Sequence, residues 1–548
     1  SDVCSSDLYI TGWAPLRRVY FHAEFSRPFD HSLLADAGRS VGEGPVINGR
    51  YLRAALSFKG KAGDTLTVRV ALSAVDEAGA RANFAAECKS WDFNSYTKTA
   101  DEAWEQRLSQ IDISATDEQK TIFYTALYHT LIHPNIMSDV DGRYVGPDQQ
   151  TKTLPKGRNF YSTFSLWDTF RAAHPLYNLL YPELAADFVH SMILHHQAYG
   201  YLPIWTLWGQ ENYCMIGNHS IPVISRAILT DIPGFNVDDA YRAMLESSTT
   251  PHKNSPFNLL EQYGFMPADF QSGSVSITLE QSFDDACLAQ TARFLGHEND
   301  AQHFAERSLY YRNLWDEKLG FFVPKEGQGQ LVEPFDPLAY DNPAFVEGNA
   351  WQYMWFVPHD PDGLIALLGG KKAFIAKLNE CFSLESELRE NGGNASGFIG
   401  QYAHGNEPAH HTAYFFNFAG CSWRTQELVN QIREQFYNAT PRGYAGNDDC
   451  GQMSAWYVFS ALGFYPFHAG SNAFTIGTPL FNCAVIHLPN EKDFTIRAPR
   501  KKDTAIYVGD VRLNGSAVAG GLSLPGLTLT QQQILGGGTL DFRMKSHH

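Results

Sequence analysis

The sequence predicts a multidomain α+β protein in which an (α/α)6 toroid is flanked by β-structure at both ends. Helix-like apolar periodicity recurs roughly twelve times between residues 116 and 463, with long polar loops between the runs. Alternating apolar and polar residues, which are typical of strands, occur before residue 95 and after residue 471. Because few strand-like runs separate the helices, a layered α/β sheet is disfavoured.

Residues 1–97 are predicted to form an N-terminal β-sandwich domain that is truncated. The segments 51–58 and 64–72 read as strands, and Gly60 and Gly63 mark a turn between them. The region is shorter than a complete sandwich, and its first eight residues fit the rest of the sequence poorly. We therefore expect that part of this domain is missing.

A linker helix is predicted over residues 98–115, followed by the catalytic toroid over 116–470. Thr116 and Gln119 have the spacing of a capping box, which predicts a helix start. The predicted helices of the toroid are 122–131, 165–180, 182–199, 223–229, 238–247, 279–295, 301–314, 351–356, 371–382, 409–419, 425–436 and 452–462.

Residues 471–548 are predicted to form a C-terminal β subdomain. The segments 494–498 and 504–508 alternate like strands. The dipeptide Asn514-Gly515 indicates a hairpin turn, because both residues tolerate a positive φ.

Composition excludes several classes of protein. The net charge of −17 argues against nucleic acids and anionic membranes as partners. No apolar run reaches the roughly 18 residues of a membrane-spanning helix, and no signal peptide is visible. The eight cysteines match no zinc pattern and are interpreted as buried free thiols, with a single disulfide as the alternative. The sequence lacks a P-loop, a GxGxxG loop, a GxSxG turn and an HExxH helix, which disfavours phosphoryl transfer, hydride transfer, serine hydrolysis and zinc proteolysis.

Three acidic residues stand at predicted helix starts, beside aromatic or amide side chains. Glu347 precedes Gly, Asn and Trp, and Asp448 and Asp449 lie in a Gly-flanked turn before an aromatic helix. Glycoside hydrolysis requires one carboxyl group that donates a proton and another that activates water. The ordinary alternatives are an acid that complements the helix dipole for Glu347 and a helix cap for the pair.

Other polar clusters accompany these acids. Asn349, Asn406, Glu407 and Gln426 form an oxygen-rich set, which favours calcium over zinc if a metal is bound. Trp167, Asp168 and Arg171 stand together at a helix start, where an intrahelical salt bridge is the simple alternative. Trp208 belongs to an aromatic-dense loop over 201–210. We interpret the tandem Asp284-Asp285 as an exposed helix face or a structural contact, without a catalytic role.

Four segments, 164–171, 347–353, 400–411 and 446–457, closely resemble glycoside hydrolase family 92 and occur in the same order. The family consists of exo-acting, calcium-dependent α-mannosidases that invert the anomeric carbon. The resemblance covers about residues 85–500. It implies an N-terminal β-sandwich, a helical linker, an (α/α)6 toroid and a C-terminal β appendage.

The resemblance also implies roles for individual residues. Glu347 is expected to be the general acid and Asp449 the water-activating base, with Asp448 beside it. Calcium is expected near Asn349, Glu407 and Gln426, where it would bind the O2 and O3 hydroxyls of the terminal mannose. The side chains expected to contact the substrate are Trp91, Trp167, Asp168, Arg171, Trp208, Asn406, His410 and His411.

The leading hypothesis is a secreted or periplasmic, monomeric α-mannosidase that acts on mannose-containing glycans. An α-1,2 linkage is favoured over α-1,3, α-1,4 and α-1,6, and specificity is expected in loops such as 386–396. One alternative is another (α/α)6 glycosidase, such as a glucosidase or a trehalase-like hydrolase. The other is a glycan-binding protein that lost its activity with the truncated N-terminal domain.

Overall fold

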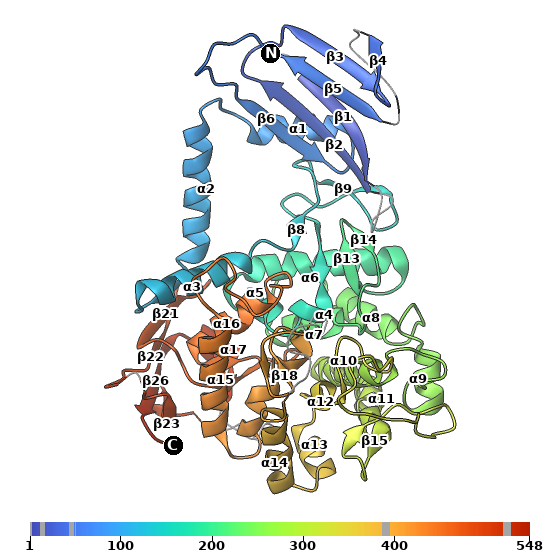
Figure 1. Cartoon of the computed structure of the whole chain (residues 1–548), viewed down its shortest axis with the longest axis vertical. Helices are drawn as coiled ribbons and strands as arrows, with labels where there is room; N and C mark the ends of the chain where they lie inside the picture. Colours follow the sequence, from blue (N-terminus) through green and yellow to red (C-terminus); the bar gives the residue numbers. More distant parts are fainter. Residues whose placement is uncertain are drawn as a thin grey trace. The chain divides into compact units, whose positions relative to one another are not determined.

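The computed structural model describes residues 3–10, 17–42, 49, 51–385, 395–502, 504–518 and 528–548 (Figure 1). The chain divides into two compact units. The first contains Ser1–Glu102 and Ile136–Phe160, and the second contains Ala103–Asn135 and Tyr161–His548. Residues 136–160 therefore return to the first unit after the chain has entered the second, which no sequence pattern indicated.

The first unit is built from strands and one packed helix. Its two three-stranded sheets have the orders β1-β2-β6 and β4-β3-β5. Helix α1 packs on β6 and begins after Asp76, whose carboxylate accepts a 2.6 Å hydrogen bond from the Gly79 N–H. The elements are β1 (Val3–Ile10), β2 (Arg17–Phe25), β3 (His31–Asp36), β4 (Arg39–Gly42), β5 (Leu52–Ser57), β6 (Val68–Ser73), α1 (Glu77–Glu87), β9 (Arg143–Val145) and β10 (Thr151–Thr153).

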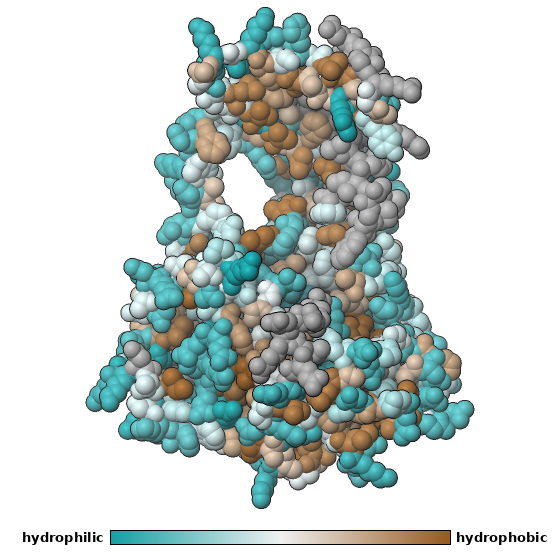
Figure 2. All heavy atoms as spheres, in the orientation of Figure 1, coloured by the Kyte–Doolittle hydropathy of each residue, from teal (hydrophilic) through white to brown (hydrophobic). Residues whose placement is uncertain are grey.

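Strand β6 alternates in burial, but its large apolar side chains lie on the exposed face, the reverse of what the sequence pattern predicts. Ala71 and Ser73 are buried, whereas Val68, Val70 and Leu72 are exposed. Figure 2 shows apolar side chains gathered on the surface of this unit. Strands β5 and β6 confirm the two strands predicted over 51–58 and 64–72.

The second unit contains most of the helices. The helix α2 (Phe93–Leu108) leads into it and overlaps the linker helix predicted over 98–115. It begins earlier than predicted, and the end of the predicted range forms the strand β7 (Ile111–Ile113) instead. The helices of this unit are α3 (Asp117–His129), α4 (Leu166–Thr169), α5 (Ala173–Leu180), α6 (Pro182–Tyr199), α7 (Ser220–Leu229), α8 (Val237–Ser247), α9 (Phe257–Tyr263), α10 (Ser274–Leu295), α11 (Glu298–Arg307), α12 (Ala350–Tyr353), α13 (Pro361–Leu367), α14 (Lys371–Cys381), α15 (Ser422–Phe436) and α16 (Gln452–Leu462).

Sequence patterns located the starts of several helices and missed local breaks. The predicted capping box is present, since Thr116 Oγ1 accepts from the Gln119 N–H and Gln119 Oε1 accepts from the Thr116 N–H. The predicted helix over 165–180 is broken into α4 and α5. The break lies at Ala172, whose N–H donates to Gln452 Oε1 from the distant start of α16. The seven-residue helices α9 and α13 were not predicted.

The C-terminal strands belong to the second unit. A six-stranded sheet has the order β24-β23-β26-β22-β21-β7, and the hairpin at Asn514-Gly515 is confirmed by positive φ values of 51° and 81°. Arg226 of α7 ties this region to the helices by donating to Ser471 O at 2.6 Å and Gln531 Oε1 at 3.1 Å. The main elements are β7 (Ile111–Ile113), β19 (Phe464–Tyr465), β20 (Ala473–Ile476), β21 (Cys483–His487), β22 (Asp493–Arg497), β23 (Tyr507–Leu513), β24 (Ser516–Ala517), β25 (Thr528–Thr530), α17 (Gln531–Leu535) and β26 (Gly538–Lys545).

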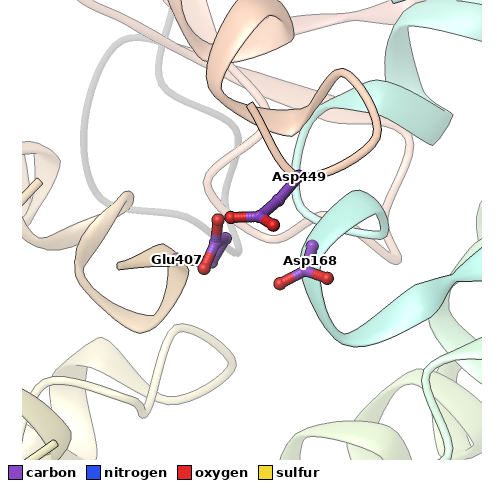
Figure 3. A group of neighbouring side chains, drawn as sticks. All are labelled: Asp168, Glu407 and Asp449. Carbon is purple, nitrogen blue, oxygen red and sulfur yellow. The ribbon is translucent and has the colours of Figure 1, made fainter. Parts of the chain in front are cut away.

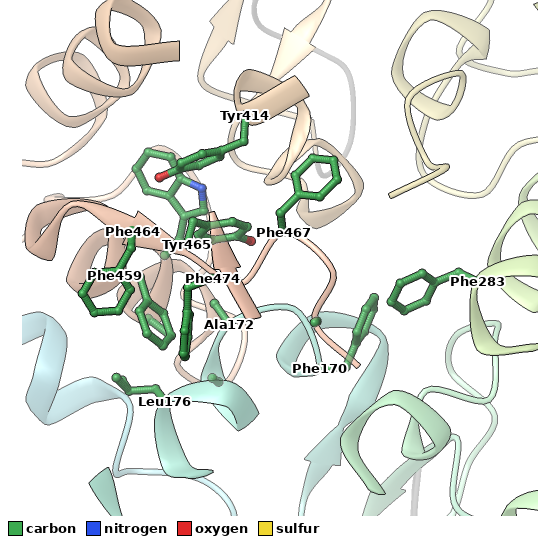
Figure 4. Packing of buried hydrophobic residues seen from close by; sticks show 14 of the residues in the cluster. Phe170, Ala172, Leu176, Phe283, Tyr414, Phe459, Phe464, Tyr465, Phe467 and Phe474 are labelled. Carbon is green, nitrogen blue, oxygen red and sulfur yellow. The ribbon is translucent and has the colours of Figure 1, made fainter. Parts of the chain in front are cut away.

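Aromatic side chains dominate the core of the second unit (Figure 4). Phe170 and Phe283 lie with ring centroids 5.5 Å apart, and Tyr414 stacks on Tyr465 at 4.8 Å. Many of the chain's aromatic side chains therefore pack the hydrophobic core of this unit. In the part of the chain that the structure describes, we found no helix with the length and apolar character to cross a membrane.

Candidate active site

Three carboxyl groups from distant parts of the chain meet in the second unit (Figure 3). Asp168 lies on α4, Glu407 begins the 3-10 helix η2 (Glu407–Ala409), and Asp449 lies in the turn before α16. One ligand atom of each lies within 4.8 Å of the others. Asp168 accepts from the Ser165 hydroxyl, which fixes one of its oxygens. This acidic triad is the chemical centre of the site.

The backbone of the Asp449 turn is unusual. Asp449, Cys450 and Gly451 have successive φ values of +46°, +55° and +91°. A side chain at Gly451 would meet Thr130 Cα at 2.8 Å, so a glycine is required there for space as well as for conformation. Left-handed non-glycine residues cost of the order of 1–3 kcal/mol each and cluster at functional sites.

The acidic triad carries an electrostatic conflict. Burial, together with the charge of Asp449, raises the pKa of Asp168 well above its usual range. Burial and the charges of Asp168 and Asp449 do the same to the pKa of Glu407. Burial also raises the pKa of Asp449. Three carboxylates this close are stable only with shared protons or a bound cation.

A cation fits the donor set of this triad. Glu407 Oε1 is buried and has no hydrogen-bond partner among the described residues. The available ligand atoms are all carboxylate oxygens, which suit a hard cation such as calcium better than a soft one.

The charge of Glu347 also acts on Asp168 of the acidic triad. After burial and the nearer groups, its charge is a further cause of the raised pKa of Asp168. The residue has a φ of +51° and is half-buried. Its carbonyl oxygen accepts from Tyr340 Oη at 2.8 Å and from Asn406 Nδ2. A fourth carboxyl group, held in a strained conformation, therefore accompanies the triad.

Asp448 has different partners from its neighbour Asp449. Its Oδ2 accepts from the Gly451 N–H at 2.9 Å, and its Oδ1 accepts from the N–H and the hydroxyl of Ser454. The carboxylate therefore satisfies free N–H groups at the start of α16. Burial raises its pKa, and the hydrogen bond from Ser454 opposes this shift.

His410 and His411 are buried and bonded to protein groups. His410 Nε2 donates to His404 O at 3.0 Å, and His410 Nδ1 accepts from Gln452 Nε2 at 3.0 Å. His411 Nε2 donates to Trp355 O at 2.6 Å. Burial lowers the pKa of both histidines to about 3, so both rings are neutral.

Trp167 and Arg171 are also buried, at 1% and 4% exposure. The indole Nε1 of Trp167 donates to Glu280 Oε1 at 2.9 Å. Arg171 Nε donates to Trp167 O at 3.1 Å, and its guanidinium lies 4.6 Å from the Phe170 ring centroid. All four side chains, Trp167, Arg171, His410 and His411, are thus buried and bonded to protein groups, and their expected contacts with a sugar stay a prediction.

A buried hydrogen-bond network next to Trp167 includes Asp284, for which the sequence left two interpretations open. His219 contacts Asp284 Oδ1 at 2.8 Å through Nδ1 and Glu280 Oε2 at 2.7 Å through Nε2. Asp285 pairs with Arg307, and neither Asp284 nor Asp285 is exposed. The structural-contact interpretation of this tandem is confirmed, and the exposed-face interpretation is wrong.

The predicted calcium ligands Asn349 and Gln426 have other partners. Asn349 caps α12, where its Oδ1 accepts from the Gln352 N–H at 3.1 Å. Gln426 Oε1 accepts from the Val508 N–H of β23 at 3.0 Å. Of the three predicted ligands, Glu407 belongs to the acidic triad, and the roles of Asn349 and Gln426 as calcium ligands stay a prediction.

The two remaining tryptophans lie in different units. Trp91 belongs to the first unit, where Arg69 stacks 3.7 Å from its ring centroid. Trp208 forms the turn between β13 (Trp205–Leu207) and β14 (Gln210–Glu211), with a φ of +51°. The carboxylate of Glu211 holds this loop by accepting from the Ile204, Trp205 and Tyr213 N–H groups at 2.7 to 3.0 Å.

Comparisons with known proteins agree with this geometry. Residues 79–546 match the family model described as the glycosyl hydrolase family 92 catalytic domain. A solved family GH92 alpha-mannosidase from Bacteroides thetaiotaomicron is 35% identical, with a TM-score of 0.91 over 98% of this chain and 71% of the other. A GH92 inverting mannosidase from the same organism is 31% identical, with a TM-score of 0.90 over 100% of this chain and 75% of the other.

A curated relative is more distant. An uncharacterized secreted glycosidase from Arthroderma benhamiae is 25% identical over 87% of this chain. The chain spans 61% of the length of that relative.

Proposed function

Since the chain belongs to glycosyl hydrolase family 92, we propose that it is an exo-acting, inverting α-mannosidase that removes terminal α-linked mannose from glycans. The observation that carries this proposal is the acidic triad of Asp168, Glu407 and Asp449, with Glu347 in the same electrostatic neighbourhood. The similarity to an alpha-mannosidase and to an inverting mannosidase supports the choice of sugar and of stereochemistry.

Two carboxyl groups divide the chemistry. The Glu347 carboxyl donates its proton to the glycosidic oxygen as the bond to the anomeric carbon breaks. Asp449 takes a proton from a water molecule, which attacks the anomeric carbon from the opposite face and yields β-mannose. Asp448 holds the turn that carries Asp449, through its hydrogen bonds to Gly451 and Ser454. Exchange with solvent restores both protonation states.

Calcium is the cation that we assign to this site. Asp168 and Glu407 would hold it, and the unpartnered Oε1 of Glu407 supports this assignment. A bound calcium ion would supply positive charge that offsets the carboxylates and polarises sugar hydroxyls.

The wider organisation is proposed on the same basis. Helices between residues 116 and 470 form the (α/α)6 toroid, residues 1–97 the N-terminal sandwich and 471–548 the C-terminal β subdomain. The linker helix is α2, which ends at Leu108. A secreted or periplasmic location is supported by the description of the Arthroderma relative as secreted. The α-1,2 linkage is our choice, although most of the loop over 386–396 lies outside the described residues.

The test is proton NMR of the purified chain with α-1,2-mannobiose, first with calcium and then with EGTA. We expect β-mannose as the first product, and no product with EGTA. Release of α-mannose first would overturn the inverting mechanism. Undiminished activity in EGTA would overturn the calcium assignment. The Asp449→Asn variant serves as the folded control without the base, and panels of α-1,3, α-1,4 and α-1,6 disaccharides test the linkage.

A further inference from the structure

The carbonyl oxygen of Glu347 is held by two side chains from different segments. Tyr340 Oη donates to it at 2.8 Å, and Asn406 Nδ2 donates to it as well. Asn406 is buried, and Tyr340 is half-buried. Two donors on one carbonyl oxygen fix the plane of the peptide that follows Glu347.

We call these two hydrogen bonds to the Glu347 carbonyl oxygen the clamp. They matter because of the backbone conformation of Glu347. With a φ of +51°, the residue occupies a region that side chains other than glycine rarely adopt. On its C-terminal side the chain is fixed by the Asn349 cap of α12. A side chain at Gly348 would lie 3.0 Å from Gln352 Oε1 and 3.2 Å from the Tyr353 ring, so the backbone there is closely packed. The two hydrogen bonds to the Glu347 carbonyl oxygen add to this constraint on the peptide that follows Glu347.

The clamp also connects Glu347 to the acidic triad. Asn406 directly precedes Glu407, so one amide side chain joins the backbone of the general acid to the segment that carries a triad member. Burial and then the charge of Glu347 raise the pKa of Tyr340, so its phenol remains a hydrogen-bond donor at working pH.

We propose that Tyr340 is a positioning residue for the general acid. By donating to the Glu347 carbonyl together with Asn406, it keeps the carboxyl directed at the glycosidic oxygen. This inference rests on the proposed function, in which Glu347 protonates the leaving group. No sequence pattern singled out Tyr340.

The test compares substrates that differ in their need for a proton. In Tyr340→Phe we expect kcat/KM for α-1,2-mannobiose to fall at least about 10-fold, because its leaving alkoxide requires general acid catalysis. For α-mannosyl fluoride, whose leaving group needs little protonation, we expect a change of about 2-fold or less. Equal losses on both substrates, or no loss on either, would overturn the positioning role.

Two further variants separate the possible failures. Tyr241→Phe is the matched control, because it removes a 2.7 Å hydrogen bond from the phenol of Tyr241 on α8 to Asp300 on α11, and it should affect neither substrate. Glu347→Gln should show the same substrate dependence more strongly. If Glu347→Gln cleaves mannobiose normally, the proposed function fails. If Glu347→Gln loses more activity on mannobiose than on mannosyl fluoride and Tyr340→Phe does not, only the positioning role of Tyr340 fails.

Hydrogen exchange gives a readout that needs no turnover. Peptides covering residues 347–353 should exchange at least about 10-fold faster in Tyr340→Phe than in Tyr241→Phe, since loss of the clamp frees the local backbone. Unchanged exchange in this segment would overturn the proposal even if the chain were inactive.

Discussion

Asp448 and Asp449 are adjacent in the chain, yet their carboxylates contact different groups. Asp448 accepts from the N–H groups of Gly451 and Ser454 at the start of α16, whereas Asp449 joins Asp168 and Glu407 in the acidic triad. The left-handed φ of +46° at Asp449 accompanies this divergence. We therefore propose that Asp448 has a structural role and Asp449 a chemical one.

This division predicts unequal effects of two matched variants. Asp449→Asn should lower kcat by about 10²- to 10⁴-fold, because it removes the base. Asp448→Asn retains an acceptor for the helix N–H groups, so kcat should fall less than about 10-fold and stability by about 0.5–2 kcal/mol. Steady-state kinetics and urea unfolding measure both. The exposed Asp362→Asn on α13 is the control, and equal loss of kcat in the two variants would contradict the division.

Calcium should stabilise the folded chain through Glu407. At a free concentration 100-fold above its Kd, the ion should add about 2.7 kcal/mol to the free energy of unfolding. Glu407→Gln should remove most of this increment, since it replaces a buried carboxylate whose Oε1 has no partner among the described residues. The exposed Glu317→Gln should retain it. Thermal unfolding with and without EGTA checks this, and an undiminished calcium effect in Glu407→Gln would exclude Glu407 as a ligand.

The buried His219 predicts a pH-dependent contribution to stability. Burial opposes the imidazolium, but contacts with Asp284 and Glu280 outweigh it and raise the pKa of His219 to about 9. The contribution should be fully present below about pH 6.5, the unfolded value, and be lost as the pH rises through about 9. Its size is of the order of 3 kcal/mol.

Comparing wild type with His219→Gln isolates this contribution. The difference in unfolding free energy between the two proteins should shrink between pH 6.5 and pH 9.5. The exposed His303→Gln should show no such trend. A difference that stays constant over this range would mean that His219 does not gain a proton on folding.

The ion pair between Asp285 and Arg307 should contribute strongly to folding. Both side chains are 1% exposed, and Arg307 NH2 lies 2.6 Å from Asp285 Oδ1. Asp285→Asn should cost about 3–5 kcal/mol, because it removes the fully buried counter-charge of the Arg307 guanidinium and leaves only the partly exposed Glu261 to pair with it. The exposed pair of Arg242 and Asp239 on α8 is the comparison, and Arg242→Gln should cost less than about 1 kcal/mol. Chemical denaturation measures both, and similar costs would contradict the importance of burial here.

Local sequence patterns were sufficient for elements whose signals lie within a few residues. Thr116 and Gln119 located a helix start, and Asn514-Gly515 located a hairpin, because capping and turn formation depend on neighbours in the chain. They failed at Ala172, where an amide from residue 452 takes the N–H groups that would have continued a helix. No local pattern contains that partner.

The sequence by itself determined the family of this protein, the acids Glu347, Asp448 and Asp449 as its candidate chemical groups, and Glu407 as a candidate metal ligand. Only the tertiary structure decided which of them meet. It joined Asp168 to Glu407 and Asp449, which follow it by more than 200 residues. It placed Asp448 at a helix end and gave Asn349 and Gln426 hydrogen-bond partners elsewhere. It also brought Tyr340 to Glu347. The physical reason is that residue type and spacing report on local backbone and burial, whereas partner choice depends on packing between distant segments.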